Sequence, residues 1–261
     1  MGRHVDYDSL APTYNGRYMA SPRPRTAASL RALLERAQAE RVLEVGCGTG
    51  HWLQALSPEK HTRWGLDLSH GMLQQARAGS FDLPLVQARA GRLPFGDANF
   101  DAIYCVNALH HFDEQRGFIL EARRRLRPGG LLAFIGTDPH GRRESWYVYD
   151  YFAGTYETDL QRFPSWGTVT DWMLEAGFER LELLPVERIE ESWAGRKVYG
   201  STFLQKDACS QLALLSDAAY VAGLERMEEA IREAERRREF LYFRSDILLQ
   251  LLVGWVPADP S

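Results

Sequence analysis

One glycine-rich turn constrains the fold more than any other feature of this 261-residue sequence. It reads Gly46-Cys47-Gly48-Thr49-Gly50 and stands between the apolar run 41–45 and a helical pattern that begins near His51. Glycine adopts positive φ readily and lets the main chain approach a ligand closely. The start of a helix adds N–H groups without intrahelical partners and a partial positive charge. The order strand, turn, helix therefore predicts a site for a nucleotide-like cofactor, and a plain tight turn is the alternative.

Short apolar runs alternate with helical patterns through the first half of the chain, which predicts βαβ units around a parallel sheet. After the first strand at 41–45, further strands are expected at 64–68, 85–88, 100–106 and 131–137. Ser69 and Asp113 are expected to cap the helices that follow them. Pro128-Gly129-Gly130 is expected to end the second of these helices.

The second half of the chain has a different character. Eight aromatic residues lie in the segment from Trp146 to Trp166. Hydrophobic periodicity predicts a helix over 167–176, strands over 181–189 and 248–255, and a long helix around 220–234. The aromatic side chains either pack a helical cap onto the sheet or line a dry pocket for an apolar or aromatic ligand.

Composition narrows the class of protein. Apolar residues make up 45% of the chain, charged residues make up 25%, and the formal net charge is −4. No global basic field therefore attracts nucleic acid. The three cysteines form no Cys-x-x-Cys pair, so neither a disulfide framework nor a metal site is expected. The first residues contain no apolar signal core, and the apolar run at 247–256 is too short to span a bilayer. The cytoplasm is the expected location, and the oligomeric state stays open.

The spacing around the turn selects the kind of cofactor. A dinucleotide fingerprint, Gly-x-Gly-x-x-Gly, requires its third glycine where this chain has His51. Glu44 precedes the first glycine by two positions and would face a cationic amino group better than a phosphate. Asp67, near the end of the second strand, can accept hydrogen bonds from two ribose hydroxyls, or it can act as a helix-capping acid. An NAD-dependent oxidoreductase is therefore a remote alternative.

These residues resemble the class I S-adenosylmethionine-dependent methyltransferases, in particular the small-molecule type 11 group that includes ubiquinone-biosynthesis methyltransferases. The resemblance covers roughly Tyr7 to Asp138. The matching segments are Tyr7-Asp8-x-x-Ala11-x-x-Tyr14, Leu43–Gly50, Gly65–Ser69, Leu93-Pro94-Phe95 with Phe100-Asp101, Asn107–Phe112 and Leu126–Gly130.

The resemblance implies an α/β fold: a Rossmann-like, seven-stranded, mostly parallel sheet with an antiparallel last strand, helices on both faces and a helical cap insertion. It implies a single domain over 1–261, with an amino-terminal lid (1–25), a cofactor-binding half (26–138), and a substrate cap with the late strands (139–261). The implied reaction is in-line transfer of a methyl group from S-adenosylmethionine to a small-molecule acceptor, apolar or aromatic, which leaves S-adenosylhomocysteine. A catalytically silent sensor or assembly protein is the alternative.

The same resemblance supplies a set of cofactor-binding residues. They are Glu44, Gly46, Cys47, Gly48, Gly50, Asp67, Leu68, Met72, Ala90, Asn107, Ala108 and Tyr14. Arg89 departs from the family pattern, because relatives carry an acidic or amide residue there to hold the adenine amino group. A guanidinium group cannot accept a hydrogen bond, so Arg89 either stacks on the ring or turns away from it.

Candidate catalytic and acceptor-binding residues follow from position in the chain. His110 and His111 stand where the donor methyl would lie, and either can act as a base or simply bond backbone groups. Asp138, after the fifth strand, is a catalytic candidate or a plain loop acid. The residues expected near the acceptor are Arg17, Tyr18, His140, Trp146, Tyr149 and Phe152.

Overall fold

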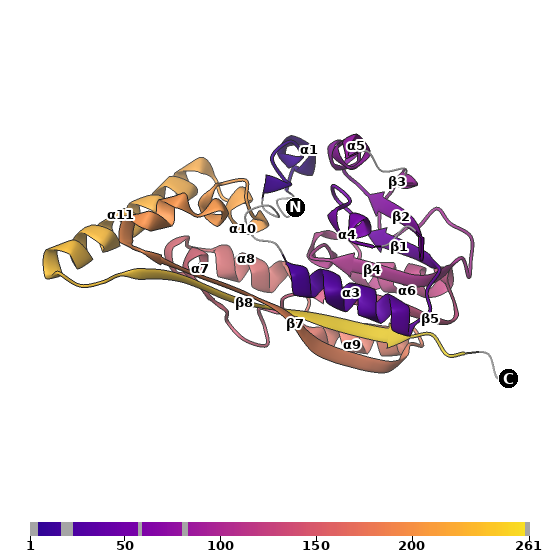
Figure 1. The fold of residues 1–261 in the computed structure, drawn as a ribbon. Helices are drawn as coiled ribbons and strands as arrows, with labels where there is room; N and C mark the ends of the chain where they lie inside the picture. Colours follow the sequence, from indigo (N-terminus) through magenta and orange to yellow (C-terminus); the bar gives the residue numbers. More distant parts are fainter. Residues whose placement is uncertain (1–4, 17–22, 57–58, 80–82, 259–261) are drawn as a thin grey trace.

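The computed structural model describes residues 5–16, 23–56, 59–79 and 83–258. Their centre is a twisted sheet with the order β3-β2-β1-β4-β5-β8, and β7 pairs with the outer side of β8 (Figure 1). The first five strands are parallel, and β8 runs antiparallel to both of its long neighbours. The strand bounds are Arg41–Val45 (β1), Thr62–Asp67 (β2), Leu85–Gln87 (β3), Phe100–Val106 (β4), Leu126–Gly136 (β5), Glu179–Ala194 (β7) and Tyr242–Trp255 (β8). The mostly parallel α/β sheet with antiparallel late strands is therefore confirmed.

Helices cover both faces of the sheet. On one face, α3 (Pro24–Arg36) and α4 (His51–Gln54) contribute buried side chains such as Leu30, Leu34 and Trp52 to a core cluster with β1, β4, β5 and β8. On the other face, α6 (Gln115–Arg125) and α9 (Trp166–Glu175) bury Phe118 and Met173 against the opposite side of the same strands. The strands are thus sandwiched between two apolar layers, which fixes the positions of their carboxyl ends.

A third apolar cluster belongs to a cap at one end of the sheet. It combines a two-residue strand, β6 (Ser145–Trp146), with helices α7 (Tyr147–Tyr151), α8 (Thr155–Arg162), α10 (Ser210–Ala213) and α11 (Asp217–Arg237). The 3-10 turns Gly195–Gly200 and Thr202–Leu204 lead from β7 into α10. At Gly223 in α11, an added Cβ would lie 2.2 Å from the Phe152 ring, so this helix needs a glycine to pack so closely.

The hairpin of β7 and β8 extends beyond the parallel sheet and carries α11 with it (Figure 1). Its outer half was not predicted, because exposed polar residues such as Glu190 and Ser192 interrupt the apolar pattern there. β6 also pairs with this part of β8 and was not predicted, so the described sheet has eight strands rather than the expected seven. Among the described residues, no helix is long and apolar enough to cross a membrane.

Two local expectations were wrong. Helix α6 ends at Arg125, and Pro128-Gly129-Gly130 lies inside β5, whose Leu126 already pairs with Phe100 across an irregularity in the ladder. Asp113 is not the cap residue of α6, because the cap position falls on Glu114, whose side chain makes no capping hydrogen bond. The Ser69 cap is confirmed: its hydroxyl oxygen accepts the Met72 N–H at 3.1 Å at the start of α5 (His70–Ala78).

Candidate active site

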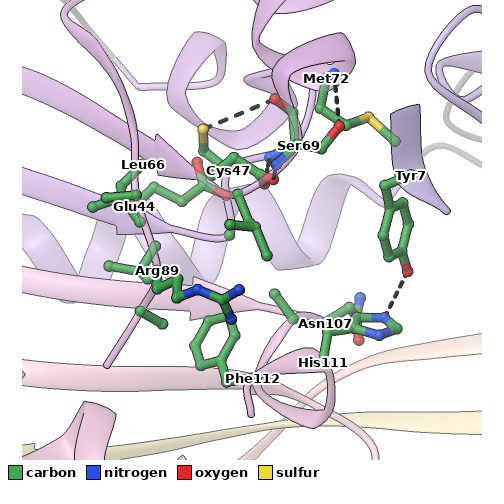
Figure 2. A pocket seen from close by; sticks show the side chains of 18 of the residues that line it. Tyr7, Glu44, Cys47, Leu66, Ser69, Met72, Arg89, Asn107, His111 and Phe112 are labelled. Atoms are coloured by element: carbon green, nitrogen blue, oxygen red, sulfur yellow. Dashed lines mark hydrogen bonds between the residues drawn. The ribbon is translucent and has the colours of Figure 1, made fainter. Parts of the chain in front are cut away.

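A cavity of about 660 Å³ opens at the carboxyl ends of β1, β2 and β4. Open α/β sheets bind ligands at this edge. The wall consists of the glycine turn, the segments 66–69, 88–92, 106–108 and 111–114, and the short lid helix α1 (Tyr7–Leu10) (Figure 2). Every wall residue lies before position 115, so the described cap residues contribute none of it.

The glycine turn has the backbone that its sequence predicts. Gly46, Gly48 and Gly50 have φ of +73°, +53° and +75°, in the region where other residues are strained. An added Cβ on Gly46 would lie 2.5 Å from the Cβ of Ala108. The turn and the segment after β4 therefore touch only because position 46 has no side chain. Gly46, Cys47 and Gly48 line the cavity, whereas Gly50 is the cap residue of α4.

Asp67 braces the turn from the end of β2. Its Oδ2 accepts the Gly48 N–H at 2.7 Å, and its Oδ1 accepts the Ser69 N–H at 2.9 Å. Burial raises the pKa of this carboxyl, and the two backbone donors oppose that rise. Asp67 lines the cavity, and its contact with a ribose stays a prediction.

Glu44 is a fully buried acid in the cavity wall. Its Oε2 accepts the Tyr104 hydroxyl at 3.2 Å. No group of the described chain hydrogen-bonds its Oε1. Burial holds the pKa of this carboxyl well above its usual range. A buried acid in a cavity wall, with one oxygen that no described group hydrogen-bonds, fits a cationic group brought in by a ligand, because such a group would compensate the cost of ionising it.

The lid is fastened to the start of α5. Asp8 accepts the Ser69 hydroxyl at 2.6 Å and the Gly71 N–H at 2.7 Å through the same oxygen. These hydrogen bonds lower the pKa of Asp8. Asn15 accepts the Thr49 hydroxyl at 2.5 Å, so the lid segment also touches the glycine turn. Tyr14 lines the cavity. Arg17 and Tyr18 lie outside the described residues.

The segment after β4 forms the wall opposite the lid. Asn107 has a left-handed φ of +50° and donates its N–H to the Ile135 carbonyl at 2.7 Å. The 3-10 turn Leu109–His111 follows and directs its two histidines differently. His111 lines the cavity and lies 2.6 Å from the Tyr7 hydroxyl (Figure 2). The ring of His110 stacks on Phe163 with centroids 3.8 Å apart, and His110 is not a wall residue.

The remaining cofactor candidates also line this cavity: Leu68, Met72, Ala90, Asn107 and Ala108. Arg89 lines it as well and points its guanidinium group at Asp113, with Nη1 2.6 Å from Oδ2. No sequence pattern predicts this pair, because the two residues come from different loops. Trp52, Phe112 and Tyr7 are wall residues to which the sequence assigned no separate role.

Several acceptor-side candidates lie away from the cavity. Asp138 accepts backbone N–H groups from His140 and Trp166, at 2.8 and 2.9 Å, so it organises its own loop. The ring of His140 donates to the Phe163 carbonyl at 2.8 Å. The three predicted aromatic residues belong to the apolar cluster of the cap, because packing of α7 against α11 and β8 buries them: Trp146, Tyr149 and Phe152. Contact of these residues with an acceptor stays a prediction.

Comparisons with known proteins agree with this geometry. The family model described as "Methyltransferase domain" matches residues 43–134. The chain is 35% identical over 115 residues to the phthiotriol/phenolphthiotriol dimycocerosates methyltransferase of Mycobacterium leprae, a match that covers 42% of each chain. It is 30% identical over 164 residues to the demethylmenaquinone methyltransferase of Listeria monocytogenes serotype 4a, covering 52% of this chain and 69% of that one.

The likeness extends to solved structures. A protein from an antibiotic biosynthesis pathway of Anabaena variabilis superposes with a TM-score of 0.69 at 19% identity, over 90% of this chain and 98% of that one. Such low identity shows the shared fold alone. The matched part of the mycobacterial relative is less than half of its length, whereas the Listeria match spans more than two thirds. Together with the glycine turn and the cavity, these matches identify S-adenosylmethionine as the methyl donor, and the chain belongs to the class I S-adenosylmethionine-dependent methyltransferases.

Proposed function

We propose that this chain transfers the methyl group of S-adenosylmethionine to an apolar or aromatic small-molecule acceptor. The observation that carries the proposal is one cavity in which the glycine turn, Asp67 and the Asn107–His111 segment meet. When bound, S-adenosylmethionine supplies a methyl group on a sulfonium that is already activated for displacement. The protein must then mainly align an acceptor behind that methyl group, which is catalysis by positioning.

The wall residues fit the parts of this donor. The glycine turn offers close backbone approach, and the unused oxygen of Glu44 suits the cationic amino group of the methionine part. Asp67, at the end of β2, suits the ribose hydroxyls, because each carboxylate oxygen can accept more than one hydrogen bond. Leu68, Met72 and Phe112 offer apolar surface to the base.

Tyr7 and His111 form a pair that can remove a proton from the acceptor. The hydroxyl of Tyr7 donates to Nε2 of His111 when the histidine is neutral. In this arrangement the Tyr7 oxygen accepts the acceptor's proton while the Tyr7 proton moves to His111. The acceptor then attacks as the conjugate base, and His111 carries the additional positive charge. The step is useful only for an acceptor that is protonated at the working pH.

The apolar character of the acceptor is proposed from the relatives. Those matched are named for dimycocerosates and for demethylmenaquinone, both of which are lipid-like molecules.

The proposal is tested by incubating the chain with methyl-labelled S-adenosylmethionine and a panel of quinols, phenols and fatty acids. Label in an extracted product, with stoichiometric S-adenosylhomocysteine, is the expected result. Tight binding of S-adenosylhomocysteine without label transfer to any member of the panel or to a metabolite extract would favour a silent binding protein. The number of methyl groups transferred per bound cofactor distinguishes an active methyltransferase from a silent binding protein.

A further inference from the structure

Three apolar residues of the cavity wall offer surface that a flat ring could cover. Leu68 lines the cavity, and 54% of the surface of this large apolar residue is exposed. Ala90 and Phe112, from two other loops, line the same cavity. Covering such residues removes apolar surface from water, which favours a ring-shaped ligand group between them.

The base of the methyl donor belongs beside these residues. In the proposed function Asp67 holds the ribose at the carboxyl end of β2, and β3 is the next strand outward in the sheet. A base attached to that ribose reaches the segment 88–92, which follows β3. Arg89 and Asp113 line the cavity together with this segment, and Figure 2 shows Arg89 beside Phe112, away from Tyr7 and His111.

Arg89 and Asp113 present two opposite hydrogen-bonding groups side by side. Nη1 of Arg89 lies 2.6 Å from Oδ2 of Asp113, and their side chains are 68% and 49% exposed. An ion pair so exposed contributes little to folding stability. A guanidinium group only donates hydrogen bonds, and a carboxylate only accepts them, at up to about four positions. The carboxylate can therefore keep Arg89 and still accept from a ligand.

The hydrogen-bond donor and acceptor of this pair are complementary to those on one edge of adenine. The exocyclic amino group of adenine donates, and the adjacent ring nitrogen N7 accepts. Hypoxanthine has a carbonyl oxygen in place of that amino group, so its exocyclic position accepts. We propose that the Arg89–Asp113 pair reads the adenine of the methyl donor: Asp113 accepts from the amino group, and Arg89 donates to a neighbouring ring nitrogen. The proposal rests on the proposed function, since it places the methyl donor in this cavity.

This assignment explains how a chain with arginine at position 89 can still select adenine. An acid at position 89 would accept from the amino group directly. Here the acid comes from position 113, at the end of the loop after β4, and Arg89 holds it at the cavity. The two residues are 24 positions apart, so only the fold brings them together.

The test compares S-adenosylhomocysteine with S-inosylhomocysteine, which differ at the base alone, by calorimetric titration of the full chain. Wild type is expected to bind the adenosyl ligand at least about tenfold more tightly, because a site built for a donor rejects an acceptor. Asp113→Asn is expected to reduce that ratio about tenfold, since an amide can donate to the carbonyl oxygen. Arg89→Gln is expected to reduce it as well, because it releases Asp113. Melting temperatures check that each variant is folded.

Glu114→Gln is the matched control, since Glu114 is the neighbouring carboxylate in the same wall. It is expected to keep the wild-type ratio. The inference is overturned if wild type binds both ligands equally, if folded Asp113→Asn keeps the ratio within twofold, or if Glu114→Gln alone removes the preference. In each of these cases wild type still binds the adenosyl ligand, so the proposed function stands. Absence of binding of either ligand to wild type would instead contradict the proposed function.

Discussion

The hydroxyl of Tyr7 lies 2.6 Å from Nε2 of His111, across 104 positions of sequence. Tyr7 belongs to the lid helix α1, and His111 belongs to the turn after β4. In the proposed reaction, the lid helix would therefore supply one member of the pair that removes the acceptor's proton. We expect this pair to be complete only when the lid rests on the cavity, which would couple enclosure of the cofactor to proton transfer.

Removing either member of this pair should slow methyl transfer without abolishing cofactor binding. Tyr7→Phe and His111→Asn are each expected to lower kcat by about 10²–10⁴-fold, the usual contribution of a general base. The Kd for S-adenosylhomocysteine should change much less. Tyr242→Phe, an exposed tyrosine on β8, is the control. Equal losses of kcat in Tyr7→Phe and Tyr242→Phe would contradict the role of Tyr7. A larger loss of kcat in His110→Asn than in His111→Asn would show that His110, and not His111, handles the proton.

Glu44 should make cofactor binding depend on pH. The raised pKa of the free carboxyl should fall when a cationic amino group arrives, because the opposite charge favours ionisation. Binding then releases a proton, and affinity should rise as the pH increases above the ordinary value of 4.5 for this carboxyl towards its raised value in the ligand-free protein. Calorimetry in buffers of different ionisation enthalpy measures the release. Glu44→Gln, or a ligand that lacks the amino group, should show no such release.

The same carboxyl should affect the stability of the ligand-free protein. A raised pKa means that the folded state binds more protons than the unfolded state between the two pKa values. The contribution of Glu44 is therefore fully present below its ordinary value of 4.5 and is lost as the pH rises through its folded value. Melting temperatures of wild type should fall relative to those of Glu44→Gln over this range. A constant difference between the two proteins would contradict the burial of an ionisable carboxyl.

Gly46→Ala should damage both folding and binding. The left-handed φ costs a side chain about 1–2 kcal/mol, and crowding against Ala108 adds about 1–3 kcal/mol. Adding Ala108→Gly should recover the crowding component and leave the backbone strain. Gly96→Ala provides the comparison, because an added Cβ there meets nothing within 4 Å. The unfolding free energy and the affinity for S-adenosylhomocysteine are measured for wild type, Gly46→Ala, Gly46→Ala with Ala108→Gly, and Gly96→Ala. Equal effects of the single substitutions at positions 46 and 96 would refute the close approach of the glycine turn to Ala108.

Asp8→Asn should loosen the lid. The substitution removes a charged acceptor from the Ser69 hydroxyl and the Gly71 N–H, and loss of one charge-assisted hydrogen bond corresponds to roughly tenfold. The dissociation rate of S-adenosylhomocysteine in stopped flow should rise by about that factor, while Asp150→Asn, in an exposed pair with Arg143, should not change it. The pKa of Asp8 is lowered, so the contact persists above its ordinary value of 3.8 and is lost as the pH falls through the folded value. An unchanged dissociation rate in Asp8→Asn would contradict the fastening.

Local patterns predicted the parts of the fold that depend on neighbouring residues. The bounds of β1 and β4 are those expected, because these strands are buried on both faces and form continuous apolar runs. The outer half of the β7–β8 hairpin was missed, because its strands pair with each other beyond the sheet and expose one face. The cap of α6 was misplaced by one residue, since Asp113 is drawn to Arg89 instead.

The candidate site also contains residues that local sequence predicts and residue pairs that only the fold brings together. The glycine turn, Glu44 and Asp67 could be predicted, because the constraint on each is local: a positive φ, or a position at a strand end. The choice between His110 and His111 could not, since adjacent residues of a 3-10 turn point in different directions. Pairs across the fold, Tyr7 with His111 and Arg89 with Asp113, have no sequence pattern and depend on how the lid and two loops meet.

The most direct test of the account is a calorimetric titration of the full chain with S-adenosylhomocysteine. One site per chain is expected, with a Kd on the order of micromolar, and the heat of binding should disappear or weaken strongly in Gly46→Ala but persist in Gly96→Ala. No detectable binding to the folded wild type, or binding that Gly46→Ala leaves unchanged, would contradict the assignment of this cavity to the methyl donor.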